Sequence, residues 1–201
     1  MCRTSCLHIL DGMNTIPHAS TPGYHGVRFY ENDSSLAQIV ADFIADGVAR
    51  GEPAIVVATA VQRAAILRAL VDKSVDVIEL QKADDLILLD AATTLSTFMK
   101  DGKPNRNAFT HAMCEPIARA CRGRQNCTVR IYGQMVDLLW QQGHKDEAIR
   151  LEIFWNSLAD SHAFSLLCGY AIGNFYKGGQ EEICRHHTHV VSPDGSSKAV
   201  A

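Results

Sequence analysis

The sequence has no long apolar run, little net charge and few aromatic residues. None of its apolar stretches approaches the roughly 20 residues that a membrane helix needs. The 19 basic and 22 acidic residues leave a formal net charge of -3, which disfavours a broad phosphate-binding face for nucleic acid. Aromatic residues make up only 7% of the chain, but 47% of the 201 residues are hydrophobic. That fraction is enough to close a core and excludes wholesale disorder.

Motifs that would identify a chemistry directly are also missing. There is no GxGxxG, no Gly-Lys-Ser/Thr phosphate loop and no G-x-S-x-G turn. We therefore expect no cofactor, no complete catalytic constellation and no enzymatic activity. No CxxC pair occurs, and the seven cysteines are dispersed, so we expect reduced thiols and no zinc ribbon. The first residues lack the apolar segment of a secretory signal, which predicts a cytoplasmic protein.

Composition divides the chain into a core and two ends. Residues 1–22 and 192–201 are rich in small and polar residues without periodicity, and we expect both to be loose tails. Between them lies no polar linker and no internal repeat. We therefore predict a single domain over residues 25–191.

Within that domain, helical and strand patterns alternate. Residues 33–50 and 59–70 repeat apolar residues at helical spacing, and residues 54–58 form a short β-branched run typical of a buried strand. The other predicted strands are 75–80, 86–89, 128–132 and 164–172; the other predicted helices are 93–99, 107–121 (kinked or split at Pro116), 135–140 and 146–158. This alternation predicts an α/β fold with a mostly parallel sheet and helices on both faces.

Polar residues at the carboxyl ends of the predicted strands are candidates for binding, since ligands of open α/β sheets bind there. Arg63, one turn into a helix, is placed to meet an anion or else to lie in solvent. Asp90 ends a strand and is suited either to a ligand or to capping the next helix. In the helix 146–158, Glu152 and Asn156 lie one turn apart among apolar residues. Either at least one of them points inward, with Gln134, Arg130 or a bound ligand as its partner, or Glu152 lies at the surface beside a buried Trp.

A cluster of ligand-type residues lies near the end of the domain. If residues 184–189 are helical, Cys184 and His187 share one face and His186 and His189 another. Either pair would supply two zinc ligands, with His25 as a third candidate by residue type only. The alternative is a helix whose histidines lie near its last carbonyl groups, and we assign no metal site on this evidence.

Taken together, several segments resemble the MEDS family, the methanogen/methylotroph sensory domain of DcmR-type regulators. The resemblance spans residues 25–191 and is carried by segments 25–30, 88–104, 129–140, 151–156, 164–170 and 183–187. It implies a three-layer RecA/KaiC-like P-loop fold that lacks a Walker A loop. It also implies a sensory module for small hydrocarbon-derived compounds. Many members carry Glu where this chain has Gln134, which removes a charge at a strand end.

From the residues and the resemblance, we predict a cytoplasmic signal-transduction module that binds a small, partly apolar ligand. Its partner is expected to be a histidine kinase or DNA-binding regulator, because this chain contains no helix-turn-helix or kinase segment. No direct contact with nucleic acid or membrane is expected. The alternatives are a degenerate nucleotide hydrolase and a ligand-free interaction subunit. The predicted ligand-binding residues are Arg63, Asp90, Arg130, Tyr132, Gln134, Met135, Glu152, Trp155, Asn156, Cys168 and Tyr170.

Overall fold

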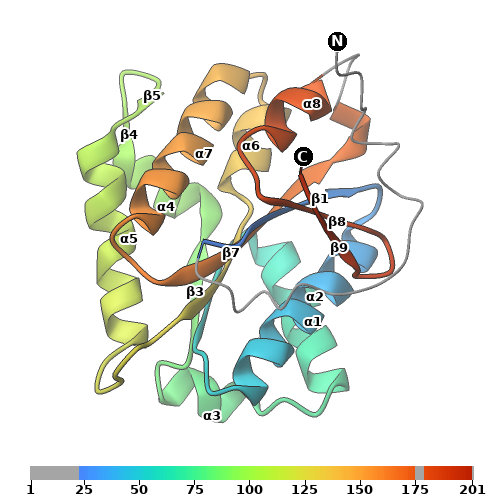
Figure 1. The fold of residues 1–201 in the computed structure, drawn as a ribbon, viewed down its shortest axis with the longest axis vertical. Helices are drawn as coiled ribbons and strands as arrows, with labels where there is room; N and C mark the ends of the chain where they lie inside the picture. Colours follow the sequence, from blue (N-terminus) through green and yellow to red (C-terminus); the bar gives the residue numbers. More distant parts are fainter. Residues whose placement is uncertain (1–22, 175–178, 201) are drawn as a thin grey trace.

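A computed structural model describes residues 23–174 and 179–200 (Figure 1). The main sheet contains β1 (His25–Tyr30), β2 (Ala54–Ala58), β3 (Leu86–Asp90), β6 (Val129–Gly133), β7 (Phe164–Ala171), β8 (His189–Val191) and β9 (Ser197–Ala199). A small hairpin is formed by β4 (Met99–Lys100) and β5 (Lys103–Pro104). The helices are α1 (Asp33–Ala49), α2 (Ala60–Asp72), α3 (Val77–Lys82), α4 (Ala91–Phe98), α5 (Arg106–Ala120), α6 (Met135–Gln141), α7 (Lys145–Ala159) and α8 (Gly179–Cys184). Among the residues described, no helix is both long and apolar enough to cross a bilayer.

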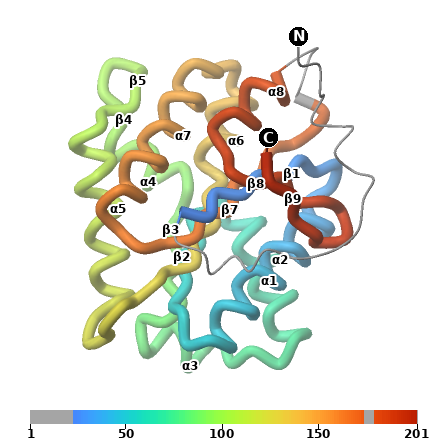
Figure 2. Tube along the Cα trace, viewed as in Figure 1, coloured from blue at the N-terminus to red at the C-terminus, as the bar shows by residue number. Residues whose placement is uncertain are grey.

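The described strands of the main sheet follow the order β3-β2-β6-β7-β1-β8-β9, and every neighbouring pair is parallel except β8–β9. β1 therefore lies between β7 and β8, with Val27 opposite both Cys168 and Val190. Figure 2 shows the start and the end of the described chain close together, because β8 pairs with β1 and β9 pairs with β8. The prediction of a mostly parallel sheet is confirmed.

Helices cover both faces of the sheet and divide the core in two. One apolar cluster packs α1, α2 and α3 against one face, and the other packs α4 to α8 against the opposite face (Figure 1). Because both faces are covered, the central strands are buried along their whole length, as in β2 and β6. This explains their continuous apolar runs and confirms the predicted helix–sheet–helix layers.

Side-chain caps set several helix starts close to where the sequence places them. The Asn32 side chain accepts from Ser35 N at the start of α1, and Thr59 accepts from Gln62 N at the start of α2. Each oxygen satisfies one of the free amides of a first helical turn. α5 runs through Pro116 as one helix, so the predicted kink or split does not divide it.

Three elements differ from the expectation. Residues 75–80 were expected to form a strand, but residues 77–82 form α3, because the Asp76 side chain caps Glu79 N and outweighs the β-branched composition. Residues 25–30, which had no predicted structure, form β1. Residues 197–199, expected in a loose tail, form β9 and pair with β8. Residues 1–22, the other expected tail, lie outside the described residues.

The cysteines also differ from the expectation of reduced thiols. Cys121 and Cys127 form a disulfide that closes the turn between α5 and β6. Cys184 is also disulfide-bonded, whereas Cys114 and Cys168 are free. The dispersed spacing of the cysteines gave no indication of this pairing.

Candidate functional site

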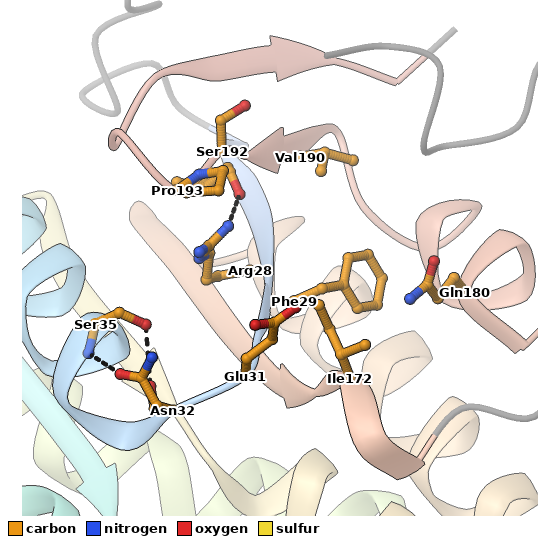
Figure 3. A pocket seen from close by; sticks show the side chains of 11 residues that line it. Arg28, Phe29, Glu31, Asn32, Ser35, Ile172, Gln180, Val190, Ser192 and Pro193 are labelled. Carbon is orange, nitrogen blue, oxygen red and sulfur yellow. Dashed lines mark hydrogen bonds between the residues drawn. The ribbon is translucent and has the colours of Figure 1, made fainter.

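A cavity of about 420 Å³ lies at the carboxyl ends of β1 and β8 (Figure 3). We call it the Arg28 pocket. Its wall is formed by Arg28, Phe29, Glu31, Asn32, Ser35, Ile172, Gln180, Val190, Val191, Ser192 and Pro193. These residues come from the end of β1, the first turn of α1, the residue after β7, α8, and the turn after β8. The pocket therefore occupies the edge of the sheet where open α/β folds bind ligands.

The pocket combines an apolar wall with a buried cation. Phe29 and Ile172 lie close together on the side of Gln180, while Arg28 points toward the chain at Ser192 and Pro193 (Figure 3). The volume and mixed lining are those of small-molecule sites, which measure roughly 300–1,000 Å³. A ligand here would meet mostly carbon and one strong hydrogen-bond donor.

Arg28 is only 7% exposed, yet its hydrogen bonding is incomplete. Its Nη1 donates to the carbonyl oxygen of Val191 at 3.2 Å, and its Nε–H has no acceptor among the described residues. Burial lowers the pKa of Arg28, while the charges of Asp194 and Glu31 raise it. A buried guanidinium donor without an acceptor is costly, so the geometry favours a bound group that accepts a hydrogen bond.

The turn between β1 and α1 does not suit a phosphate. Phosphate loops at such strand–helix turns use glycines so that backbone amides can approach the anion. Here the turn carries Glu31 and Asn32, and α1 begins with Asp33. The Asn32 side chain already occupies the amide of Ser35. The carboxylates of Glu31 and Asp33 repel a phosphate, and the Ser35 amide is already hydrogen-bonded to Asn32. Both features disfavour nucleotide binding in this pocket.

A second polar cluster lies between α7 and the sheet, near the start of β1. Glu152 is fully buried and accepts a hydrogen bond from Tyr170 Oη at 2.6 Å. Its other carboxylate oxygen lies 3.2 Å from His25 Nε2 and 3.6 Å from Cys168 Sγ. His187 Nε2 lies 3.5 Å from Glu152 Oε1, the oxygen that accepts from Tyr170. The structure thus brings together predicted ligand residues and two of the predicted metal candidates.

Burial sets the protonation of this cluster. It raises the pKa of both Cys168 and Tyr170, and the charge of Glu152 raises them further, so the thiol and the phenol keep their protons. Burial, with a smaller contribution from His25, lowers the pKa of His187 to about 3. Burial raises the pKa of Glu152, but its contacts with His187, His25 and Tyr170 lower it to about 2, so Glu152 is the anion of the cluster. His187 is neutral near pH 7.

The amino-acid sequence of most of the chain matches a known family. The model of the methanogen/methylotroph, DcmR sensory domain (MEDS) matches residues 24–188. The chain belongs to this family. A KaiC-like protein from the hyperthermophilic archaeon Pyrococcus horikoshii OT3 has a similar fold, with a TM-score of 0.56 and 16% identity over 84% of this chain and 71% of that chain. No curated protein matches the sequence. The predicted family and KaiC-like fold are confirmed.

In this MEDS domain, two predicted residues meet at the ends of β2 and β3. Arg63 Nη1 donates to Asp90 Oδ2 at 2.9 Å and to the carbonyl oxygen of Leu89 at 3.1 Å. Asp90 also caps α4 by accepting from Thr93 N. That backbone hydrogen bond, followed by the contact with Arg63, lowers the pKa of Asp90 to about 2. The capping role considered for Asp90 is therefore present.

The remaining predicted ligand residues lie apart from the Arg28 pocket. Gln134, at the end of β6, is 6% exposed and accepts from Thr59 N at 2.9 Å. Arg130 is at the opposite end of β6, where its guanidinium contacts Asp46 and Glu52. Arg130 is therefore not the partner of Glu152 that an inward-pointing Glu152 was considered to have. Tyr132, Met135 and Trp155 are fully buried in the two apolar clusters.

The expected pairing of metal candidates on one helix is wrong. α8 ends at Cys184, so the helical spacing that would join Cys184 to His187 and His186 to His189 does not continue. Cys184 is in a disulfide. His189 belongs to β8 and stacks on Tyr24, with ring centroids 4.8 Å apart. Only His187 and His25 remain together, with ring centroids 4.1 Å apart.

Proposed function

We propose that this MEDS domain is a cytoplasmic sensory module that binds a small, partly apolar ligand in the Arg28 pocket. It passes the signal to a partner histidine kinase or DNA-binding regulator. The observation that carries the proposal is the pocket's apolar wall next to the Nε–H of Arg28, which has no hydrogen-bond acceptor among the described residues. Membership in a sensory family supports the signalling role.

The ligand class follows from the lining. Phe29, Ile172 and Val190 provide an apolar surface, and Arg28 requires a hydrogen-bond acceptor. Short-chain alcohols, ketones and carboxylates have both features and are hydrocarbon derivatives. Glu31 disfavours ligands with a large negative charge, because it lines the same pocket.

Signalling by such a ligand requires that it favour one arrangement of the pocket over another. The pocket joins the first turn of α1 to the turn that follows β8. A ligand that contacts both segments stabilises the arrangement in which they are close. We propose that the partner protein recognises this arrangement, so that the function is binding and not catalysis.

Replacing Arg28 with glutamine should weaken ligand binding by about 10- to 100-fold, because a charge-assisted hydrogen bond contributes about 1.5–3 kcal/mol. Calorimetry over a panel of short-chain alcohols, ketones and carboxylates, with ATP included, measures this. Arg150→Gln, at an exposed position on α7, is the matched control and should bind like the wild type.

Ile172→Trp provides an independent test, since it fills the pocket from its apolar side without removing the cation. It should abolish binding while the unfolding temperature changes little. Failure of the wild type to bind any panel member would overturn the proposal in favour of a ligand-free interaction subunit. Binding of ATP alone would instead support a degenerate nucleotide hydrolase.

A further inference from the structure

We propose that the buried cluster of His25, Glu152, Cys168 and His187 is a binding site for a transition-metal ion of the zinc class. One ligand atom from each residue lies within 4.8 Å of the others, and all four side chains are buried. They come from four separate elements: the start of β1, α7, the middle of β7 and the turn after α8. The site is separate from the Arg28 pocket, and the two proposals do not depend on each other.

The spacing of the ligand atoms matches tetrahedral zinc. Ligands at 2.0–2.3 Å from a tetrahedral ion lie about 3.3–3.8 Å from one another. Here His25 Nε2 is 3.2 Å from Glu152 Oε2 and 3.5 Å from Cys168 Sγ. Cys168 Sγ is 3.6 Å from the same carboxylate oxygen. Three corners of the site therefore already have the edge lengths that an ion requires.

Hydrogen bonds outside the cluster fix the tautomer of His25. Asn156 Nδ2 donates to the carbonyl oxygen of His186 at 2.9 Å, so its Oδ1 faces His25 Nδ1, at 2.8 Å. An amide oxygen only accepts, so Nδ1 carries the proton. His25 Nε2 then faces Glu152 and Cys168, where it donates a hydrogen bond when protonated and ligates an ion when it is not. Metal-binding histidines are held by an outer hydrogen bond of this kind.

His187 is oriented in the same way. Its Nδ1 lies 2.8 Å from the carbonyl oxygen of Ile183, which can only accept, so this nitrogen also carries the proton. Its Nε2 is buried, has no hydrogen-bond partner among the described residues, and lies 3.5 Å from Glu152 Oε1. Two imidazole Nε2 atoms thus face one carboxylate, and that of His187 has no hydrogen-bond partner among the described residues, so the arrangement suits a cation between them.

Charge and ligand type indicate which cation. Glu152 as a carboxylate and Cys168 as a thiolate together carry two negative charges, so a divalent ion makes the buried site neutral. Binding releases the thiol proton of Cys168 to solvent. Two imidazoles, one thiolate and one carboxylate favour zinc or another late transition metal over magnesium or calcium, which prefer oxygen ligands. Tyr170 Oη donates to Glu152 Oε1 and leaves Oε2 free to face the ion.

Cobalt substitution tests the site in the full chain, prepared without a histidine tag. The wild type should bind about one equivalent of Zn²⁺ or Co²⁺, as structural sites of this kind do. The Co²⁺ form should show a thiolate-to-cobalt charge-transfer band and the visible bands of tetrahedral cobalt. Cys168→Ser should lose the charge-transfer band. Cys114→Ser is the matched control, because Cys114 is also free and also contacts a histidine, His162.

Asn156→Ala keeps the test independent of folding, because Asn156 is exposed and lies outside the proposed ligand set. It should weaken metal affinity about 10- to 100-fold, the usual effect of removing an outer hydrogen bond. Added Zn²⁺ should raise the unfolding temperature of the wild type but not that of Cys168→Ser. Less than about 0.2 equivalents of metal after loading, or a charge-transfer band that persists in Cys168→Ser, would overturn the proposal. The first result would leave the cluster as a hydrogen-bonded His–Glu pair.

Discussion

Arg130→Ala should lower the free energy of unfolding by about 3–5 kcal/mol, which is the usual cost of truncating a large, fully buried side chain. The Arg130 side chain is 0% exposed, contacts the Glu52 carboxylate through Nε, and lies 3.0 Å from Asp46 through Nη2. Its guanidinium also lies 4.9 Å from the centre of the Phe43 ring. The substitution removes these contacts and leaves a cavity under α1. Urea unfolding followed by circular dichroism measures the change.

Two further variants show whether packing around Arg130 causes the loss. Arg68→Ala, at an exposed position on α2, should change stability by no more than about 0.5 kcal/mol. Gly47 lies against Arg130, and a Cβ added there would be 2.4 Å from Arg130 Cγ. Gly47→Ala should therefore destabilise the wild type, although alanine is the better helix former. In the Arg130→Ala background the same change should stabilise. Equal effects in both backgrounds would contradict this account.

Arg130 was predicted to bind a ligand but forms ion pairs with Asp46 and Glu52 instead, which shows what a strand pattern can and cannot predict. A strand was predicted over residues 128–132, the structure has β6 at Val129–Gly133, and Gln134 does lie at its carboxyl end. Arg130, however, is four residues earlier, and at about 3.3 Å per residue it lies some 13 Å from that end. The carboxylates that it binds come from α1 and the turn before β2, and no local pattern links those residues to it. The number of residues between Arg130 and Gln134 was therefore enough to predict that the two side chains lie at opposite ends of the strand.

The Arg28 pocket was missed for a related reason. Residues 25–30 were not predicted as a strand, so the carboxyl end of β1 was not among the predicted binding positions. Two signals were present: the segment HGVRFY is largely apolar, and Asn32 caps the helix that follows it. The other wall of the pocket comes from β8 and the turn after it, some 160 residues later in the chain. Their pairing with β1 is set by the topology of the sheet.

The proposed metal site shows the limit of spacing arguments most clearly. His25, Glu152, Cys168 and His187 were each noted as candidates for binding, but they were assigned to different sites. Ligand motifs are recognisable when two ligands share one helix or one turn. Here every ligand comes from a different element. Only the register that places β1 beside β7 and under α7 brings them together.

Asp137→Ala should destabilise the domain by about 2–6 kcal/mol, because it leaves two donors without an acceptor, at about 1–3 kcal/mol each. Asp137 is 0% exposed and accepts from Tyr30 Oη at 2.7 Å, Gln141 Nε2 at 2.7 Å and Ala171 N at 3.1 Å. It thereby joins the carboxyl ends of β1 and β7 to α6. Gln141 is exposed and can bond to water instead, so the loss comes from Tyr30 and Ala171.

Asp137→Asn should change how stability depends on pH. Burial raises the pKa of Asp137 above its ordinary 3.8, although its three hydrogen bonds lower it. A carboxyl whose pKa is higher in the folded state takes up its proton more readily there. It therefore contributes stability below its unfolded pKa, and this contribution is lost as pH rises through the folded pKa. Relative to Asp137→Asn, the wild type should gain stability as pH falls from about 8 to about 4.

Chemical denaturation of both proteins across that range measures the difference directly, and titrations shared by the two proteins cancel in it. Asp33 carries the charge that adds to the burial effect, so Asp33→Asn should reduce the shift without abolishing it. A difference that stays flat, or that grows as pH rises, would show that the hydrogen bonds to the carboxylate outweigh burial. In that case Asp137 would stay ionised while it accepts hydrogen bonds from β1, β7 and α6. Removing its charge would then lower the free energy of unfolding most near neutral pH.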